Sequence, residues 1–171
     1  MRTLILGGAR SGKSALAERL AARHDAVLYI ATAAAGDDEM AQRILHHRER
    51  RPAHWELCET PLLLAATLKR EAHASRCVLV DCLTLWLSNL LCSSDESLFA
   101  RERAAVLAVI DELPGEIILV SNEVGQGVVP LGELTRRFVD EAGRLHQDLA
   151  ARCERVVFTT AGLPHVLKGT L

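Results

Sequence analysis

The chain has 171 residues, of which 49% are hydrophobic and 25% are charged, and its formal net charge is −2 at pH 7. This length and hydrophobic fraction predict a single folded domain over residues 1–171 and exclude a disordered chain. The near balance of charge argues against a protein that binds nucleic acid or a membrane surface.

The cysteines and the hydropathy pattern predict a cytoplasmic protein without a membrane span. The five cysteines contain no CxxC pair, which argues against a disulfide framework or a structural zinc site. We expect reduced core thiols, with Cys77, Cys82 and Cys92 in apolar surroundings. The apolar N-terminal stretch is too short for a signal peptide, and Asp81 interrupts the most hydrophobic segment, residues 77–92.

Short apolar runs alternate along the chain with stretches of helical period. The predicted elements are, in chain order, strand 3–6, helix 13–23, strand 27–32, helix 38–50, helix 61–74, strand 77–81, a possible helix 83–91, helix 99–112, strand 116–121, helix 131–152 and strand 155–160. Apolar strands between helices predict an α/β fold, with a mostly parallel sheet and helices on both faces. Ligands bind at the carboxyl ends of such strands, so the residues after each strand are candidate site residues.

A glycine-rich segment, GGARSGKS, follows the first predicted strand and precedes a helix. It matches the phosphate-loop pattern G-x-x-x-x-G-K-[ST] and comprises Gly7, Gly8, Ala9, Arg10, Ser11, Gly12, Lys13 and Ser14. The glycines allow backbone N–H groups to point at a phosphate, and the helix N-terminus adds the positive end of its dipole. Lys13 can reach the β- and γ-phosphates, and Ser14 can bind Mg²⁺. This context predicts a nucleoside triphosphate site rather than an ordinary glycine-rich turn.

Polar residues also follow two later strands. Asp81 closes the strand 77–81, where a carboxylate on the Mg²⁺ side belongs, although it could also cap the next helix. Asn122 and Glu123 follow the strand 116–121 and could contact nucleotide, substrate or an attacking hydroxyl. They could equally shape the glycine-containing turn that follows. No NKxD segment is present, which argues against a switch GTPase.

The segment RILHHRERRPAHW gathers arginines and histidines after the second strand. On the predicted helix 38–50, His46 projects away from the apolar side, with Arg43 and Arg50 as its neighbours one turn away. These cations would keep the imidazole neutral and able to attack a bound triphosphate. Spacing alone favours a solvated basic helix face over this nucleophile. A metal site is disfavoured because His46 and His47 diverge by about 100° on a helix.

The chain resembles the bifunctional adenosylcobinamide kinase / adenosylcobinamide-phosphate guanylyltransferase family over nearly its whole length. The segments that carry the resemblance are GGARSGKS, YIATA, DDEM, RILHHRERRPAHW, VDCLTLWLSNLL, SNEVGQGVVP, RRFVDEAGRLHQ and GLPHVLKG. The phosphate loop alone fits many families, whereas HHRERRPAHW together with SNEVGQGVVP is far more specific. The resemblance implies a three-layer, RecA-like P-loop NTPase fold and assembly as a homotrimer.

The resemblance also implies two reactions and a set of site residues. A nucleoside triphosphate, ATP or GTP, phosphorylates adenosylcobinamide with Mg²⁺, and GTP then donates GMP to adenosylcobinamide phosphate through a guanylyl-histidine. His46 matches that histidine, and Lys13 is the second catalytic candidate. Besides the phosphate loop, the implied nucleotide contacts are Ala31, Thr32, Ala33, Glu49, Arg50, Arg51, Pro52, Glu59 and Asp81.

The sequence departs from the family pattern at His146 and His165, where asparagine and a branched apolar residue are usual. Both departures lie outside the nucleotide motifs, so they concern the substrate pocket or subunit contacts. Two other functions remain open: a P-loop kinase without nucleotidyl transfer, and a RecA-like regulatory nucleotide-binding module. A covalent guanylyl intermediate at His46 distinguishes the predicted function from both of these alternatives.

Overall fold

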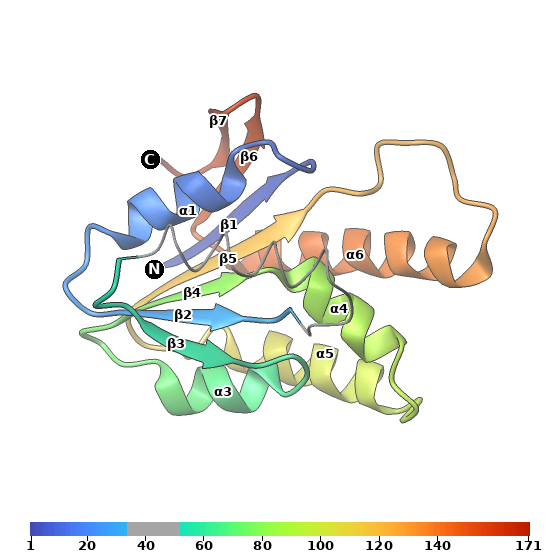
Figure 1. Ribbon diagram of the computed structural model, residues 1–171, viewed down its shortest axis with the longest axis horizontal. Helices are drawn as coiled ribbons and strands as arrows, with labels where there is room; N and C mark the ends of the chain where they lie inside the picture. The colour runs from blue at the N-terminus through green and yellow to red at the C-terminus, as the bar shows by residue number, and fades with distance from the viewer. Residues whose placement is uncertain (34–51) are drawn as a thin grey trace.

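The described part of the chain is built around one seven-stranded sheet (Figure 1). The structure, a computed structural model, describes residues 1–33 and 52–171. The strands are β1 (Arg2–Gly7), β2 (Val27–Ala31), β3 (Glu56–Glu59), β4 (Cys77–Asp81), β5 (Glu116–Asn122), β6 (Arg155–Thr160) and β7 (Leu163–Lys168). Their order in the sheet is β3-β2-β4-β5-β1-β6-β7, and each pairing is parallel except the antiparallel pair β6 and β7.

Helices cover both faces of this sheet, as the sequence predicts. They are α1 (Lys13–Ala21), α3 (Leu64–Glu71), α4 (Leu83–Leu91), α5 (Leu98–Val109) and α6 (Glu133–Arg152). Alternate strand residues point to opposite faces, so the apolar strands feed two cores. One core packs Ile5, Leu79 and Val120 against α1, and the other packs residues such as Leu4 and Leu119 against the remaining described helices. The result is a three-layer α/β architecture.

Two strands were not predicted, and both lie at an edge of the sheet. β3 has only four residues and reads ELCE, three of them exposed, so it shows no apolar signal. β7 reads LPHVLK, is exposed throughout, and carries Pro164, which a strand tolerates only at an edge. Neither strand needs a buried face, and the apolar pattern therefore misses both. The predicted helix 38–50 lies outside the described residues.

The expectation of core thiols is confirmed for three of the five cysteines and is wrong for Cys58, which is half-buried, and for Cys92. Cys77, Cys82 and Cys153 are buried, and burial raises the pKa of the Cys77 and Cys153 thiols to about 12. Those two thiols therefore behave as small apolar core groups. Cys92, which follows the last turn of α4, is exposed because it lies at the C-terminal end of the helix rather than on its buried face.

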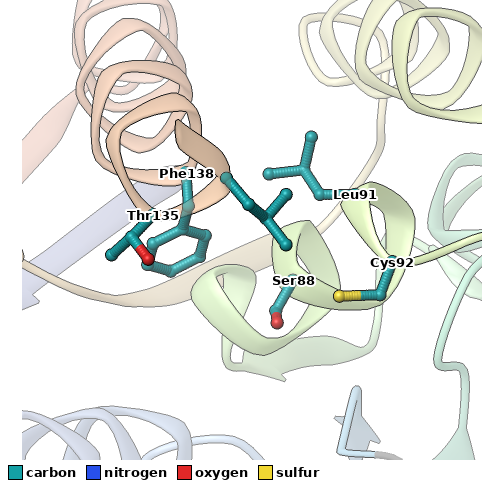
Figure 2. Close-up of a pocket in the computed structure, with 6 residues that line it drawn as sticks. Ser88, Leu91, Cys92, Thr135 and Phe138 are labelled. Atoms are coloured by element: carbon teal, nitrogen blue, oxygen red, sulfur yellow. The ribbon is translucent and has the colours of Figure 1, made fainter. Parts of the chain in front are cut away.

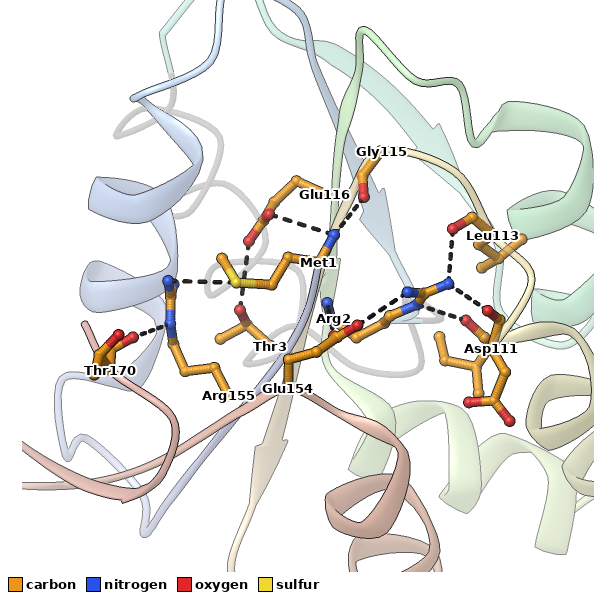
Figure 3. Close-up of polar contacts among 11 residues, drawn as sticks. Met1, Arg2, Thr3, Asp111, Leu113, Gly115, Glu116, Glu154, Arg155 and Thr170 are labelled. Carbon is orange, nitrogen blue, oxygen red and sulfur yellow. Dashed lines mark hydrogen bonds and ion pairs between the residues drawn. The ribbon is translucent and has the colours of Figure 1, made fainter.

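Arg2 ties the first strand to two segments that are distant in the sequence (Figure 3). Its guanidinium donates hydrogen bonds to the carbonyl oxygens of Ile110, Asp111 and Leu113, and it forms an ion pair with Glu154 at 3.0 Å. The Arg2 side chain is only 18% exposed, so solvent does not readily replace these bonds.

We expect Arg2→Ala to lower the free energy of unfolding by about 1–3 kcal/mol, because three carbonyl oxygens, two of them in part-buried hydrogen bonds, lose their donors. Urea denaturation with circular dichroism measures this loss. Arg101→Ala is the matched control, since the Arg101 side chain is 59% exposed and its ion pair with Asp95 lies at the surface. Equal unfolding midpoints for the two variants would contradict the role assigned to Arg2.

Candidate functional site

The phosphate loop connects β1 to α1 and is shaped by its glycines. Gly12 has φ of +95°, which favours glycine, and α1 begins at the next residue, Lys13. A Cβ atom at Gly7 would lie 2.5 Å from the carbonyl oxygen of Thr159, so only glycine fits beside β6. The loop therefore leads directly into a helix N-terminus, as the predicted triphosphate site requires.

The turn between β6 and β7 supports the phosphate loop, a contact that the sequence did not predict. The Gly162 N–H donates a 2.8 Å hydrogen bond to the carbonyl oxygen of Ser11. A Cβ atom at Gly12 would lie 3.0 Å from the Gly162 Cα atom. The only signal in the sequence is a glycine just after a strand, and that signal is common to many turns.

Lys13 bends back onto its own loop. Its side chain is buried, and Nζ donates a 3.0 Å hydrogen bond to the carbonyl oxygen of Gly8. Burial lowers the pKa of Lys13, and the negative charge of Asp81 opposes this shift. Lysine and aspartate therefore lie close enough to interact, as expected for a cation and a carboxylate that serve one site.

The sheet register brings three predicted residues to one edge. Ala31 pairs with Glu59 on one side and with Asp81 on the other, and all three lie at the carboxyl ends of their strands. Tyr29, which the sequence did not single out, donates a hydrogen bond of 3.2 Å to Oδ2 of Asp81. The residue at the N-cap of α4 is Cys82 rather than Asp81, so the capping role considered for Asp81 is wrong.

Thr32 joins the end of β2 to the start of α4. Its hydroxyl accepts a hydrogen bond from the Cys82 N–H and donates one to the Cys82 carbonyl oxygen, at 2.9 and 2.7 Å. The Asn89 side chain donates to the Thr32 carbonyl oxygen at 2.8 Å. Thr32 is completely buried, whereas Ala31 and Ala33 on either side of it are half-buried. The Thr32 side chain therefore stabilises the backbone at this edge.

Asn122 and Glu123 extend β5 next to the phosphate loop. Asn122 pairs with Gly7, and the Glu123 N–H donates a 2.9 Å hydrogen bond to the Gly7 carbonyl oxygen. The Asn122 amide donates to the Thr84 hydroxyl at 2.9 Å. Oε1 of Glu123 accepts a hydrogen bond of 2.6 Å from the Gly125 N–H, so this carboxylate does shape the following turn.

His146 on α6 lies against this same segment. Its Nε2 atom is 2.7 Å from the Ser121 hydroxyl, and its Nδ1 atom is 3.7 Å from Oε2 of Glu123. The imidazole is buried, and this burial lowers its pKa, while the Glu123 carboxylate opposes the shift. The other departure from the family pattern, His165, is exposed on β7.

Several predicted site residues fall in the part of the chain that the structure does not describe. These are His46, Glu49, Arg50 and Arg51. Pro52 is described and exposed, and its carbonyl oxygen accepts a hydrogen bond of 3.1 Å from the Trp55 N–H. The structure therefore places the phosphate loop, the Ala31–Ala33 stretch, Asp81, Asn122 and Glu123 at the carboxyl edge, with Glu59 at the same edge but separated from β1 by three strands.

An apolar pocket of about 220 Å³ lies apart from this edge, between α4 and α6 (Figure 2). Its lining residues are Ser88, Leu91, Cys92, Leu134, Thr135 and Phe138. None of them belongs to the phosphate loop or to the ends of the strands. The pocket is therefore not part of the predicted triphosphate site.

Within residues 1–33 and 52–171, no group of three or more His, Cys, Asp or Glu side chains is placed to hold a metal ion. Magnesium in nucleotide sites is bound by one or two protein oxygens together with the phosphates, so this finding is compatible with the predicted Ser14 and Asp81 site. Among the helices of the described residues, none is long and apolar enough to cross a membrane.

Known proteins match this chain closely in sequence. The family model described as cobinamide kinase / cobinamide phosphate guanyltransferase matches residues 3–167. The bifunctional adenosylcobalamin biosynthesis protein CobP of Pseudomonas aeruginosa is 69% identical over 170 residues, which cover 99% of this chain and 98% of the relative. The bifunctional adenosylcobalamin biosynthesis protein CobU of Escherichia coli is 39% identical over 176 residues, covering 95% of this chain and 97% of that protein.

The fold also resembles that of a solved structure, an ATPase of a bacterial type III secretion system. The TM-score is 0.55 at 11% identity, over 96% of this chain and 56% of that one. Identity at this level shows the fold alone. Together with the loop between β1 and α1, it identifies the architecture as a three-layer P-loop NTPase fold.

Proposed function

The chain belongs to the cobinamide kinase / cobinamide phosphate guanyltransferase family, and we propose that its phosphate loop and carboxyl sheet edge carry out both reactions in that description. It is a bifunctional cobinamide kinase and cobinamide phosphate guanylyltransferase of adenosylcobalamin biosynthesis. We further propose which residues act in each step, which nucleotides are used and how the chain assembles.

In the kinase step, a nucleoside triphosphate lies in the phosphate loop. The N–H groups of the loop and the N-terminus of α1 bind the β- and γ-phosphates, and Lys13 exchanges the Gly8 carbonyl oxygen for phosphate oxygens. The hydroxyl of adenosylcobinamide attacks the γ-phosphorus, the bond from that phosphorus to the β-bridging oxygen breaks, and the nucleoside diphosphate leaves. The buried position of Lys13 supports this role, since its charge acts with little competition from water.

The residues at this edge fit a magnesium ion bound with the triphosphate. Ser14 offers a hydroxyl at the start of α1, and Asp81 offers a carboxylate that is half-buried and interacts with Lys13. Both are hard oxygen donors, the kind that magnesium prefers. When bound, magnesium would neutralise charge on the phosphate oxygens.

In the guanylyl-transfer step, we assign the nucleophile to His46. An imidazole nitrogen attacks the α-phosphorus of GTP, and the bond from that phosphorus to its bridging oxygen breaks, so pyrophosphate leaves. The phosphate of adenosylcobinamide phosphate then attacks the same phosphorus, and the imidazole leaves. Support comes from the sequence, because Arg43 and Arg50 on the predicted helix favour a neutral imidazole and can bind phosphate oxygens.

The observation that carries the proposal is a complete phosphate loop at the sheet edge, within a chain 69% identical to a bifunctional relative. The test supplies the purified protein with Mg²⁺, ATP or GTP, and adenosylcobinamide. We expect adenosylcobinamide phosphate first and adenosylcobinamide-GDP with pyrophosphate when GTP is present. Phosphorylation without guanylylation would indicate a kinase that lacks nucleotidyl transfer. Nucleotide hydrolysis without either product would favour a regulatory nucleotide-binding module.

We also propose that the chain assembles as a homotrimer. The connection from β5 to α6 extends beyond the sheet edge (Figure 1) and continues into the start of α6. Its exposed fractions are 94% for Val128, 73% for Val129 and 97% for Leu131, and Leu134 on α6 is 52% exposed. Of these apolar side chains, Leu134 also lines the α4–α6 pocket. A second copy of the chain would bury them.

We expect sedimentation equilibrium to give a mass of three chains for the wild type. Leu131→Asp should shift the protein toward the monomer, because a charge at the interface must be desolvated. Glu133→Gln, a charge change on the same segment, is the control and should leave the mass unchanged. A monomeric wild type at micromolar concentration would contradict the proposed assembly.

Cytoplasmic localisation and a single domain over residues 1–171 complete the proposal. The free cysteines support a reducing compartment, and the common sheet of all described strands supports one domain. No nucleic-acid partner is proposed, in accord with a net charge of −2.

A further inference from the structure

Among the described residues, three carboxylates end or directly follow strands at the carboxyl edge of the sheet: Glu59, Asp81 and Glu123. Glu59 ends β3 at the far side of the sheet, separated from β1 by β2, β4 and β5. Asp81 accepts a hydrogen bond from Tyr29 and is proposed as a magnesium ligand. Glu123 is bonded through its N–H to the Gly7 carbonyl oxygen, at the first residue of the loop. Asp81 also interacts with Lys13 of the loop but is assigned to magnesium, so Glu123 is the described carboxylate beside the loop that is left to act on a group approaching the γ-phosphate.

The Glu123 carboxylate is held by one hydrogen bond, faces His146 Nδ1 at an ion-pair distance, and still reaches solvent. Oε1 accepts the Gly125 N–H at 2.6 Å, and Oε2 lies 3.7 Å from His146 Nδ1. The side chain of Glu123 is 22% exposed, whereas that of His146 is 7% exposed. A proton acceptor needs both properties, since it must be fixed in place and must contact its substrate.

His146 is oriented by a second contact, to Ser121. The 2.7 Å distance from His146 Nε2 to the Ser121 hydroxyl fixes the plane of the ring. With an ionised carboxylate facing Nδ1, the favoured tautomer carries its proton on Nδ1 and accepts the Ser121 proton at Nε2. Ser121 is completely buried, so this Ser–His–Glu arrangement does not expose a serine nucleophile. Its effect is to orient the glutamate.

We propose that Glu123 accepts the proton of the substrate's hydroxyl during phosphoryl transfer, and that His146 is the positioning residue that holds its carboxylate. This inference rests on the proposed function. As the O–P bond to the γ-phosphorus forms, the hydroxyl proton passes to Glu123 and the nucleoside diphosphate leaves. The guanylyl-transfer step has no such need, because its nucleophiles are a neutral imidazole and an already ionised phosphate.

The inference therefore predicts a selective defect. We expect Glu123→Gln to lower kcat of adenosylcobinamide phosphorylation by about 100-fold, the usual scale for loss of a general base, with KM for adenosylcobinamide changed by less than about threefold. Labelling of the protein by GTP carrying ³²P at the α-phosphate, and transfer of that label to adenosylcobinamide phosphate, should stay within about threefold of the wild type. Gln147→Ala, an exposed change on α6, is the control for both assays.

Two substitutions at His146 distinguish a role in positioning the Glu123 carboxylate from a role in packing alone. The asparagine amide occupies roughly the place of Nδ1, and the glutamine amide roughly that of Nε2. His146→Asn keeps a donor toward Glu123, and we expect it to retain most phosphorylation. His146→Gln keeps the contact to Ser121 but loses the one to Glu123, and we expect phosphorylation to fall about tenfold with guanylylation unchanged.

Three outcomes would overturn this inference while leaving the proposed function intact. One is a Glu123→Gln enzyme that phosphorylates normally, and another is an equal loss of both reactions, which would indicate a structural role. The third is equal behaviour of the two His146 variants, which also decides the matter if Glu123→Gln does not fold. Failure of the proposed function is distinguishable, since the wild type would then show no phosphorylation or no label.

Discussion

His46→Ala is expected to abolish labelling of the protein by GTP that carries ³²P at the α-phosphate. The proposed intermediate joins GMP to an imidazole nitrogen, and alanine offers no atom to form that bond. Wild-type protein should carry an acid-labile, base-stable label, as a phosphoramidate does, and the variant should show background only. Phosphorylation of adenosylcobinamide should persist in the variant, because the kinase step requires positioning and charge stabilisation at the phosphate loop rather than an imidazole.

His47→Ala is the matched control for this experiment. The two histidines are adjacent, so each variant removes one imidazole from the same basic segment. We expect His47→Ala to keep most of its label, because His46 is the residue that matches the family's guanylyl-histidine and that projects away from the apolar side of the predicted helix. A label lost in His47→Ala and kept in His46→Ala would move the nucleophile by one residue.

Lys13→Met is expected to reduce both reactions by about 100- to 1000-fold, the usual effect of removing a preorganised charge from a developing anion. Methionine has a similar length and apolar stem, so the buried site stays filled while the hydrogen bond to the Gly8 carbonyl oxygen and the positive charge are lost. Initial rates of phosphorylation and of label transfer measure the effect. Arg19→Ala removes an exposed cation from the same helix and should leave both rates nearly unchanged.

The same variant tests whether one triphosphate site serves both steps. Parallel losses in the two rates would be expected if each triphosphate binds the loop from Gly7 to Ser14. A variant that loses phosphorylation but labels its histidine at the wild-type rate would show that GTP for guanylylation binds elsewhere. Binding of a fluorescent GTP analogue, measured alongside, separates weaker binding from slower chemistry.

The sequence by itself determined the phosphate loop, the α/β class and the principal buried strands. Its glycines, lysine and serine stand at fixed offsets after an apolar strand, and such local patterns carry their structural meaning within a few residues. The predicted helices that fall within the described residues end within a few residues of the observed bounds, as with the predicted 131–152 and the observed Glu133–Arg152. The family resemblance rested on segments of the same local kind, and the matches to known proteins confirm it.

Tertiary structure alone decided which of these segments meet. The order β3-β2-β4-β5-β1-β6-β7 places β5 beside β1, and therefore Glu123 beside Gly7, although more than 100 residues separate them. The contact of His146 with Ser121 and Glu123 likewise depends on how α6 packs on β5, which no spacing along the chain encodes. Edge strands such as β7 are stabilised by pairing rather than by burial, so they leave no apolar pattern. Sequence patterns indicate which side chains of a segment are buried. The neighbours of each strand in the sheet are instead determined by packing between segments that are distant in the sequence.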